Sequence, residues 1–260
     1  GQNRFTDRMP LGSSEDIRSI DRKTLIEFYQ QWYSPQMATV VVVGDVDPVS
    51  IEKKIKEMFA SIPRKKVKGY RVYPLTYEKG IALHEIGDDL KRSSELELMI
   101  PHPCVVGNTV GTIYRKELGS LLVRAITNRL QARQIRSNVS DAWFLSDKNH
   151  FVFTFSGTDK SGLLQQVSDL SNELECILKN GFTPEELDDA IKELSRTLKV
   201  DCSAQLSGKW CDDFVDYVIS GDRYIQSEEE MRQLLEKIRS TDSATLQKLL
   251  QEWLSYNCLL

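Results

Sequence analysis

The segment 24–59 constrains the fold more than any other, because a helical pattern, a β-branched run and a second helical pattern follow one another in it without a break. Apolar residues recur at helical spacing over 25–32, and Pro35 ends this pattern, since the residue before a proline is driven out of the α region. The run 38–43, Ala-Thr-Val-Val-Val-Val, is typical of a strand buried on both faces. Apolar residues three or four apart over 49–59 predict another helix. We interpret this segment as a scaffold, because nothing in it is chemically reactive.

Three short elements stand in a fixed order in and just before this segment. They are Arg8-Met-Pro-Leu-Gly12, Phe28-Tyr29-x-x-Trp32-Tyr33-x-Pro35 and Val40-Val-Val-Val-Gly44-Asp45-Val-Asp47. Together they resemble elements that occur in the same order and at the same spacing late in a repeat of the pitrilysin/insulinase family of zinc metallopeptidases. None of the three is specific alone, but three in register are, so the chain is identified as a member of that family. In the family this starting point lies well inside a repeat, which implies a fragment of a longer protein.

The bulk properties exclude several classes of function. A chain of 260 residues with 40% hydrophobic and 28% charged residues is long enough for one or two domains with a sizeable core. Its net charge of −4 lacks the excess of positive charge that is typical of proteins that bind nucleic acid. No apolar run reaches the length of a membrane span. The five cysteines are odd in number and scattered, so they predict no disulfide framework and leave the compartment open.

The stretch 61–77 marks the expected domain boundary. It breaks both periodicities and combines two prolines, a glycine and a basic run. We therefore expect residues 1–63 to complete a first peptidase-like repeat, residues 64–76 to form a linker, and residues 77–260 to form a second repeat without zinc.

The second half predicts an α+β fold with helices packed on one face of a mainly antiparallel sheet, because strands with alternating apolarity are separated by long helices. The phenylalanines at 151, 153 and 155 predict a core-facing strand. Thr183-Pro184 begins a capping box that launches a helix, and Gly181 before it suits a left-handed helix end. The predicted strands are 81–85, 94–100 and 150–155, and the predicted helices are 109–135, 163–178, 184–198, 206–220, 228–238 and 243–254.

No metal site is expected in this chain. Active members of the family carry His-x-x-Glu-His, in which two histidines hold zinc and the glutamate polarises water. The three histidines here, His84, His102 and His150, are too far apart for that motif. His84 begins a sequence like His-Glu-x-x-His, but Asp88 replaces the second histidine. His102 and Cys104 lack a second ligand pair, so we interpret them as loop residues. The resemblance places the zinc elsewhere in the parent protein.

Two residues are candidates for substrate binding. In the family, a segment similar to Leu-Arg-x-x-x-Gly-x-Ala-Tyr in the repeat opposite the zinc supplies an arginine and a tyrosine that hold the substrate peptide. The segment 135–143, Ile-Arg-Ser-Asn-Val-Ser-Asp-Ala-Trp, has the same length, with Arg136 and Trp143 in the key positions. Ser140 replaces the glycine, and the exchange of tyrosine for Trp143 leaves only an indole N–H donor. The alternative is that Arg136 is a solvated charge at a helix end.

The resemblance implies a non-catalytic portion of a pitrilysin-like metalloendopeptidase that forms part of a chamber wall and contacts the substrate peptide. Its partners would be that peptide and other peptidase-like repeats, in the same protein or in a partner subunit. One alternative is a degenerate peptidase-like module that serves assembly or binding without proteolysis. Another is an unrelated α+β ligand-binding domain. A His-x-x-Glu-His motif upstream in the parent protein would separate the first two.

Overall fold

The computed structural model describes residues 11–64, 73, 80–87, 92–107, 109–145, 148–203, 206–221 and 227–255. The chain divides into two compact units, residues 1–76 with 205–220, and residues 77–204 with 221–260. The division expected from the sequence, with a linker at 64–76 between 1–63 and 77–260, stays a prediction. Most of that linker, and residues 8–10 of the first sequence element, lie outside the described residues.

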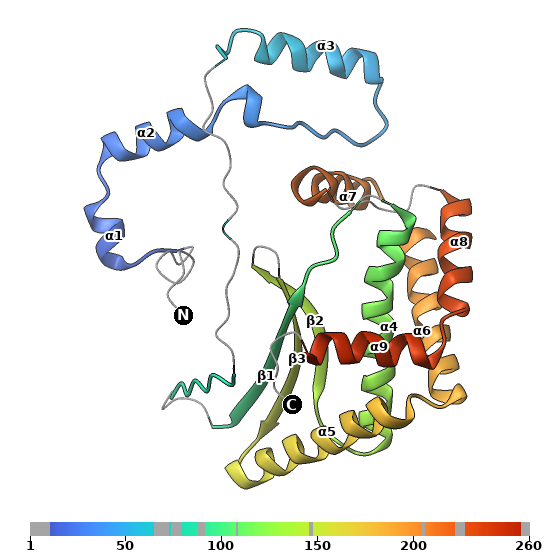
Figure 1. The fold of residues 1–260 in the computed structure, drawn as a ribbon. Helices are drawn as coiled ribbons and strands as arrows, with labels where there is room; N and C mark the ends of the chain where they lie inside the picture. The colour runs from blue at the N-terminus through green and yellow to red at the C-terminus, as the bar shows by residue number, and fades with distance from the viewer. Residues whose placement is uncertain are drawn as a thin grey trace. The chain divides into compact units, whose positions relative to one another are not determined.

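The described part of the first unit is helical. Asp21 and Asp47 precede two of its helices, and each side chain accepts a hydrogen bond from a backbone N–H in the first turn, at 2.7 Å from Thr24 N and 3.0 Å from Ser50 N. Both helices were predicted, and both are confirmed. The elements of this unit, blue to cyan and orange in Figure 1, are α1 (Ser14–Ser19), α2 (Arg22–Trp32), the 3₁₀ turn η1 (Pro35–Met37), α3 (Pro48–Phe59) and α7 (Ser207–Ser220).

The predicted strand at 38–43 is wrong. These residues form no strand, and Val40 and Val42 are each 47% exposed. A strand is stabilised by hydrogen bonds to a neighbouring strand, and no described residue of this unit offers such a ladder. The apolar side chains of α2 and α3 are likewise not buried.

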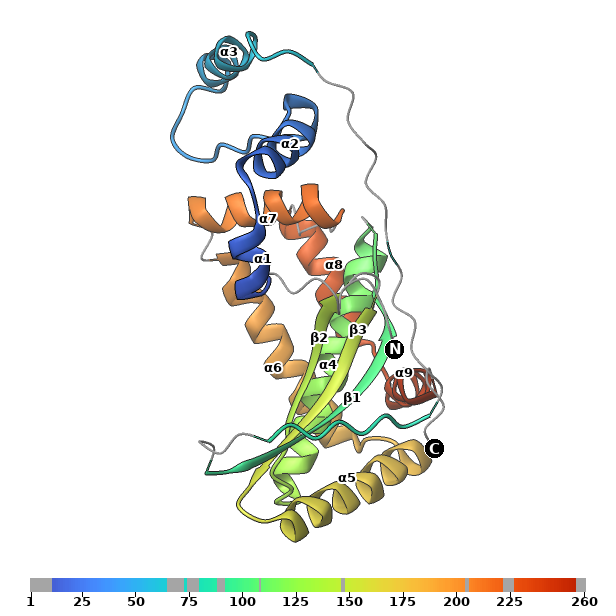
Figure 2. The ribbon, with the colours of Figure 1, turned by 90° about the vertical axis from the view of Figure 1, so that its left-hand side faces the viewer.

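The described residues of the second unit include a three-stranded antiparallel sheet, and Figure 2 shows its strands next to one another. Its strands are β1 (Ser94–Pro103), β2 (Asn138–Leu145) and β3 (Lys148–Gly157), in the order β1-β3-β2. The strands predicted at 94–100 and 150–155 are confirmed, and each is longer than expected. The strand predicted at 81–85 is wrong, because these residues are not in a sheet. The central strand β3 aligns Leu98 of β1 and Val139 of β2 with Phe153.

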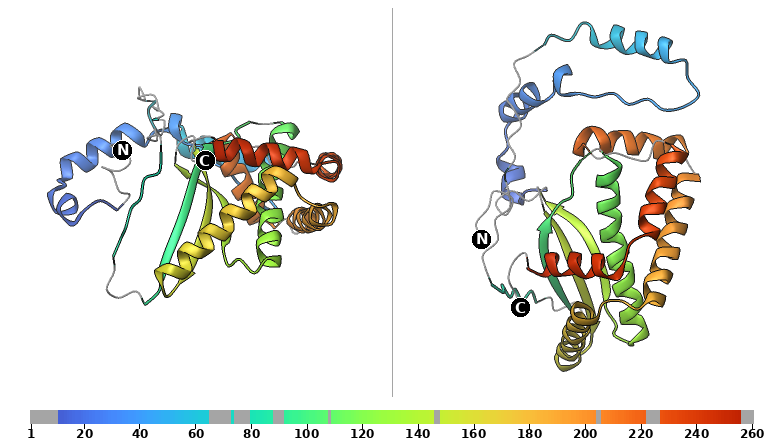
Figure 3. Two further views of the ribbon diagram at one scale, coloured as in Figure 1. Left: turned by 60° about the horizontal axis from the view of Figure 1, so that its bottom comes forward. Right: turned by 45° about the vertical axis from the view of Figure 1, so that its right-hand side comes forward.

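Helices cover one face of this sheet. The long helix α4 packs on β2, and α6 and α8 pack against α4, so that α4 lies between the sheet and these two helices (Figures 1 and 3). Helix α5 contacts β3, and α9 contacts both β1 and α4. This arrangement confirms the α+β class. The helices are α4 (Val110–Ala132), α5 (Lys160–Asn180), α6 (Pro184–Ser203), α8 (Glu228–Arg239) and α9 (Ser243–Ser255).

The core lies between the sheet and α4. The predicted stripe of Phe151, Phe153 and Phe155 is fully buried there. It packs in one cluster with leucines and isoleucines from each of the helices that the structure describes in this unit. Burial of this apolar surface is the main stabilising term for the unit, at about 25 cal/mol per Å². The fully buried members of the helices include Leu121, Leu122, Ile126, Leu130, Ile177, Leu234, Ile238 and Leu246.

Candidate functional site

Arg136 lies in the short connection between α4 and β2. Helix α4 ends at Ala132, and Gln134 turns the chain with a positive φ of 61°. The N–H of Ile135 then donates to the carbonyl of Leu130 at 2.9 Å, which closes the helix end. Arg136 follows with an exposed side chain, just before the first residue of β2.

Trp143 lies near the other end of β2. Its backbone pairs with Asn149 of β3, and a bulge follows it. Side chains four residues apart share one face of a strand, so Trp143 is on the side of the buried Val139, yet it is 65% exposed. The sequence segment that carries both candidates is therefore mostly a β-strand.

The structure does not bring Arg136 and Trp143 together. Trp143 is seven positions after Arg136, and a strand rises about 3.3 Å per residue, so they are on the order of 20 Å apart. Two side chains at that spacing cannot both bind the same chemical group of a ligand. They can contact different residues of one extended peptide.

The strand between these residues is an edge of the sheet. Among the described residues, β2 pairs only with β3. Alternate backbone N–H and C=O groups on its outer side therefore have no strand partner within the described sheet, and such an edge is the kind to which an extended peptide can add. An extended peptide that lies along β2 would pass both Arg136 and Trp143.

A buried polar cluster closes the end of the sheet near Trp143. His102 of β1 is only 3% exposed, and its Nε2 lies 3.0 Å from Oδ1 of Asp141 on β2. The amide of Asn149 on β3 donates to both oxygens of Asp141 at 3.1 and 3.2 Å. The thiol of Cys104 donates to Oδ1 of Asn149 at 3.0 Å. The interpretation of His102 as a loop residue is thus wrong, because it is a buried residue of β1.

Helix α9 covers this cluster. The ring of Trp253 stacks on His102 with centroids 4.1 Å apart and an interplanar angle of 14°. On α4, Gly119 leaves room for this ring, because a Cβ at Gly119 would come within 3.1 Å of it and 3.4 Å of Asp141. The cluster therefore links β1, β2, β3, α4 and α9 at one point.

The roles of Asp141 and Asn149 were not predicted from the sequence. The sequence shows only that each of the segments that form β2 and β3 contains polar residues among apolar ones. This pattern does not indicate which polar residues contact one another. The pairing arises from strand register, which places Asn149 opposite both His102 and Trp143. Asp141 pairs with Phe151, one step along the same face.

His150 also lies in this part of β3. Its burial lowers the pKa of the imidazole below the ordinary value of 6.5. The charge on His102 lowers this pKa further, and Asp141 partly opposes the shift. The imidazole of His150 therefore favours its neutral form in the folded protein.

The described residues contain no group of three or more His, Cys, Asp or Glu side chains placed to hold a metal ion. His84 is exposed and outside any helix or strand. Zinc would therefore find no matching ligand set in this part of the chain. The expectation that the whole chain binds no metal stays a prediction. No described helix is both long and apolar enough to cross a membrane.

The second unit has the α+β architecture expected from the sequence, and the sequence lacks the zinc motif. The chain matches the family model of the peptidase M16 inactive domain over residues 19–194, and so belongs to the M16, or pitrilysin/insulinase, peptidase family.

Relatives and solved structures agree with this assignment. The chain is 28% identical over 193 residues to the probable zinc protease PqqL of Escherichia coli (strain K12), which is 72% of this chain and 21% of that protein. It matches a Haemophilus influenzae protein of the same name at 23% identity over 203 residues.

The crystal structure of the periplasmic protease PqqL from Escherichia coli has the same fold, with a TM-score of 0.83 at 23% identity over 96% of this chain and 29% of that one. The M16 inactive domain from Pseudomonas fluorescens gives a TM-score of 0.65 at 17% identity, over 95% of this chain and 58% of that one. The chain thus spans about a fifth of the length of its curated relatives.

Proposed function

We propose that the second unit of this chain belongs to the non-catalytic repeat that faces the zinc-bearing repeat of an M16 protease, where it forms part of the chamber wall and binds the substrate peptide along β2. The observation that carries the proposal is the open edge of β2, with the exposed Arg136 before it and Trp143 near its far end. Family membership supports a non-catalytic role in a protease.

The two side chains suit a peptide in different ways. The guanidinium of Arg136 is a planar fork of donors that hydrogen-bonds carbonyl oxygens or a carboxylate. The indole of Trp143 offers a large apolar surface and one N–H donor. Backbone hydrogen bonds along β2 would supply affinity for any extended sequence, while the two side chains would set its register.

The zinc belongs to another part of the protein in this proposal. The relatives are named zinc proteases, but the described residues of this chain do not fit a zinc site. The role of this chain is therefore to hold and orient a peptide, and we assign no chemical step to its residues.

The test is the turnover of a peptide by the full-length protein with Arg136→Ala. Loss of a donor that stabilises the transition state typically costs about 10²–10³ in rate, and we expect turnover to fall about tenfold or more. Arg232→Ala is the matched control, because Arg232 is also an exposed arginine of the second unit, on helix α8, which packs against α4 and α6 and not against the sheet. We expect its turnover to match that of the wild type.

Two outcomes would oppose the proposal. Unchanged turnover in Arg136→Ala, with the zinc content intact, would remove Arg136 from the substrate site. A full-length protein that binds partners but holds no zinc and cleaves no peptide would instead favour the degenerate interaction module.

A further inference from the structure

A hollow of about 390 Å³ opens between α6 and α8, in the second unit. Helix α4 packs on β2 with one side and on α6 and α8 with another, so this hollow is separated from the β2 edge by the helix layer. Its lining is rich in cationic side chains, with three basic residues and one acidic residue. The lining residues are Asp188, Ile191, Lys192, Ser195, Arg196 and Arg239.

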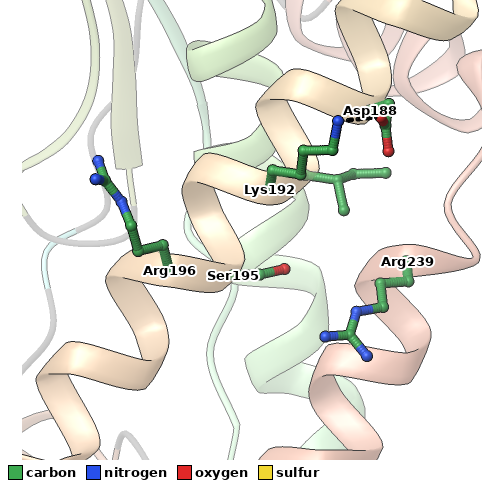
Figure 4. A pocket seen from close by; sticks show the side chains of 6 residues that line it. Asp188, Lys192, Ser195, Arg196 and Arg239 are labelled. Atoms are coloured by element: carbon green, nitrogen blue, oxygen red, sulfur yellow. Dashed lines mark ion pairs between the residues drawn. The ribbon is translucent and has the colours of Figure 1, made fainter.

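Ser195 is the unusual member of this lining. It is only 7% exposed, and among the described residues its hydroxyl has no hydrogen-bond partner. A helical serine or threonine normally donates to the carbonyl four residues earlier, as Thr197 on the same helix does to Glu193 at 3.1 Å. In Figure 4 the Ser195 hydroxyl points instead into the space between α6 and α8. A buried hydroxyl without a partner is costly, so this site favours an acceptor in addition to those that the described residues supply.

Arg239 faces Ser195 from the end of α8. Figure 4 shows its guanidinium directed into the same space. Among the described residues, no carboxylate pairs with Arg239, whereas Arg232 on the same helix pairs with Glu229 at 2.6 Å and with Glu236. The fork of Arg239 therefore keeps its donors for another acceptor.

The remaining charges contribute in different degrees. Lys192 is turned toward Asp188, and their hydrogen bond raises the pKa of the lysine. The guanidinium of Arg196 points to the other side of α6 in Figure 4, so it adds positive potential but no direct contact. The hollow thus combines a net positive charge with two convergent donors, Ser195 and Arg239.

We propose that this hollow binds a phosphate group, with the guanidinium of Arg239 and the hydroxyl of Ser195 as its direct donors. An arginine fork matches two oxygens of a tetrahedral anion, and a hydroxyl donates to a third. The ammonium of Lys192 stabilises the same negative charge at longer range. The hollow is larger than a free phosphate ion, so it also admits a phosphate monoester.

The experiment is calorimetric titration of the 260-residue chain with inorganic phosphate at constant ionic strength, since salt screens exposed charges. We expect saturable binding that Arg239→Gln weakens about tenfold or more, because a charge-assisted contact is lost. Ser195→Ala should weaken it about threefold or more, because one donor to a charged group is lost. Lys248→Gln is the control, since it removes an exposed charge from α9, outside the lining, and should leave the affinity unchanged.

The thermal unfolding temperature of Ser195→Ala provides a second test, because the expected effect without phosphate is no change or an increase. Without phosphate, Ser195→Ala should unfold at the wild-type temperature or above it, because the unpartnered hydroxyl is gone. With phosphate, the unfolding temperature of the wild type should rise more than that of the variant, since binding to the native state raises its stability.

A second ligand, phosphoserine, distinguishes a phosphate monoester from free phosphate, because the better ligand binds more tightly. Absence of saturable phosphate binding, equal affinity in wild type and Arg239→Gln, or acetate that binds as tightly as phosphate would overturn the proposal.

Discussion

The guanidinium of Arg129 donates a hydrogen bond of 3.0 Å from Nη1 to the carbonyl oxygen of Gly181, across the junction between α5 and α6. Arg129 is only 6% exposed, and its Nε lies 3.3 Å from Glu173 and 3.4 Å from Glu186. These two contacts are ion pairs without hydrogen-bond geometry, because Nε has no hydrogen-bond acceptor among the described residues. Glu186 also accepts from the backbone N–H of Thr183, as the predicted capping box requires. One buried cation thus ties α4, α5 and the start of α6 together.

Arg129→Met should destabilise the second unit strongly. The change keeps much of the apolar stem but removes the buried cation from two part-buried carboxylates and leaves the carbonyl of Gly181 without this donor. Removal of one partner from a buried ion pair typically costs about 3–5 kcal/mol, and the loss here should lie at the lower end because Glu173 keeps its ion pair with Arg133 at 3.5 Å. Arg124→Met is the matched control, because Arg124 is a more exposed residue of α4 that pairs with Glu193 at 3.6 Å, and exposed pairs contribute about 0–1 kcal/mol. The measurement is the free energy of unfolding from urea titration. Equal losses in the two variants would show that Arg129 does not act as the junction's anchor.

Gly181→Ala should also destabilise the junction. Gly181 has a φ of +73°, and a Cβ there would collide with Oγ of Ser243, the hydroxyl that accepts from the N–H of Phe182. Backbone strain and the collision together should cost about 1–3 kcal/mol. The contrasting variant is Gly111→Ala in the first turn of α4, where a Cβ meets only an ordinary contact at 3.6 Å and alanine favours the helix. We expect opposite shifts of the unfolding midpoint, and a loss in both variants would contradict this account.

Stability should fall as the pH drops below about 6.5, partly because of His150. Its folded pKa is lowered, so the unfolded chain binds more protons between the folded value and the unfolded value of 6.5. The free energy of unfolding therefore decreases as the pH falls through that window. At higher pH, protonation of His150 does not affect it. Unfolding midpoints measured from about pH 7.5 to about pH 5 should show a smaller decline in His150→Asn than in the wild type. His84→Asn, which changes an exposed histidine, should decline as the wild type does.

Local signals predicted the helices of the second unit and two of its three strands. The capping box at Thr183 and the glycine at 181 are local in sequence, and the structure has both. The phenylalanines of β3 alternate with a period of two, which identifies a core face without tertiary information. Such features are set by residues within one turn or one strand.

Features that depend on distant partners could not be predicted in the same way. The run 38–43 has the composition of a strand but no paired neighbour among the described residues. The segment 138–145 mixes polar and apolar residues, and it becomes β2 because it pairs with β3. The contact between His102 and Asp141 joins residues 39 positions apart, and only the register of three strands creates it. For the candidate site, the sequence therefore supplied Arg136 and Trp143 but not the edge strand that joins them.

The exchange of tyrosine for tryptophan, relative to the family pattern, gives a prediction about Trp143 in the full-length protein. A phenol both donates and accepts hydrogen bonds, whereas the indole only donates, so Trp143→Tyr should leave peptide turnover unchanged or raise it. The side chain is 65% exposed, so the variant should fold as the wild type does. Trp143→Ala should raise the KM, because it removes the apolar surface that would contact the peptide. The measurements are kcat and KM with one peptide, with Arg136→Ala assayed in parallel. If Trp143→Tyr lowered kcat/KM as much as Trp143→Ala did, the peptide would require a specific contact with the indole. The side chain at position 143 would then not act as an aromatic surface that tyrosine can replace.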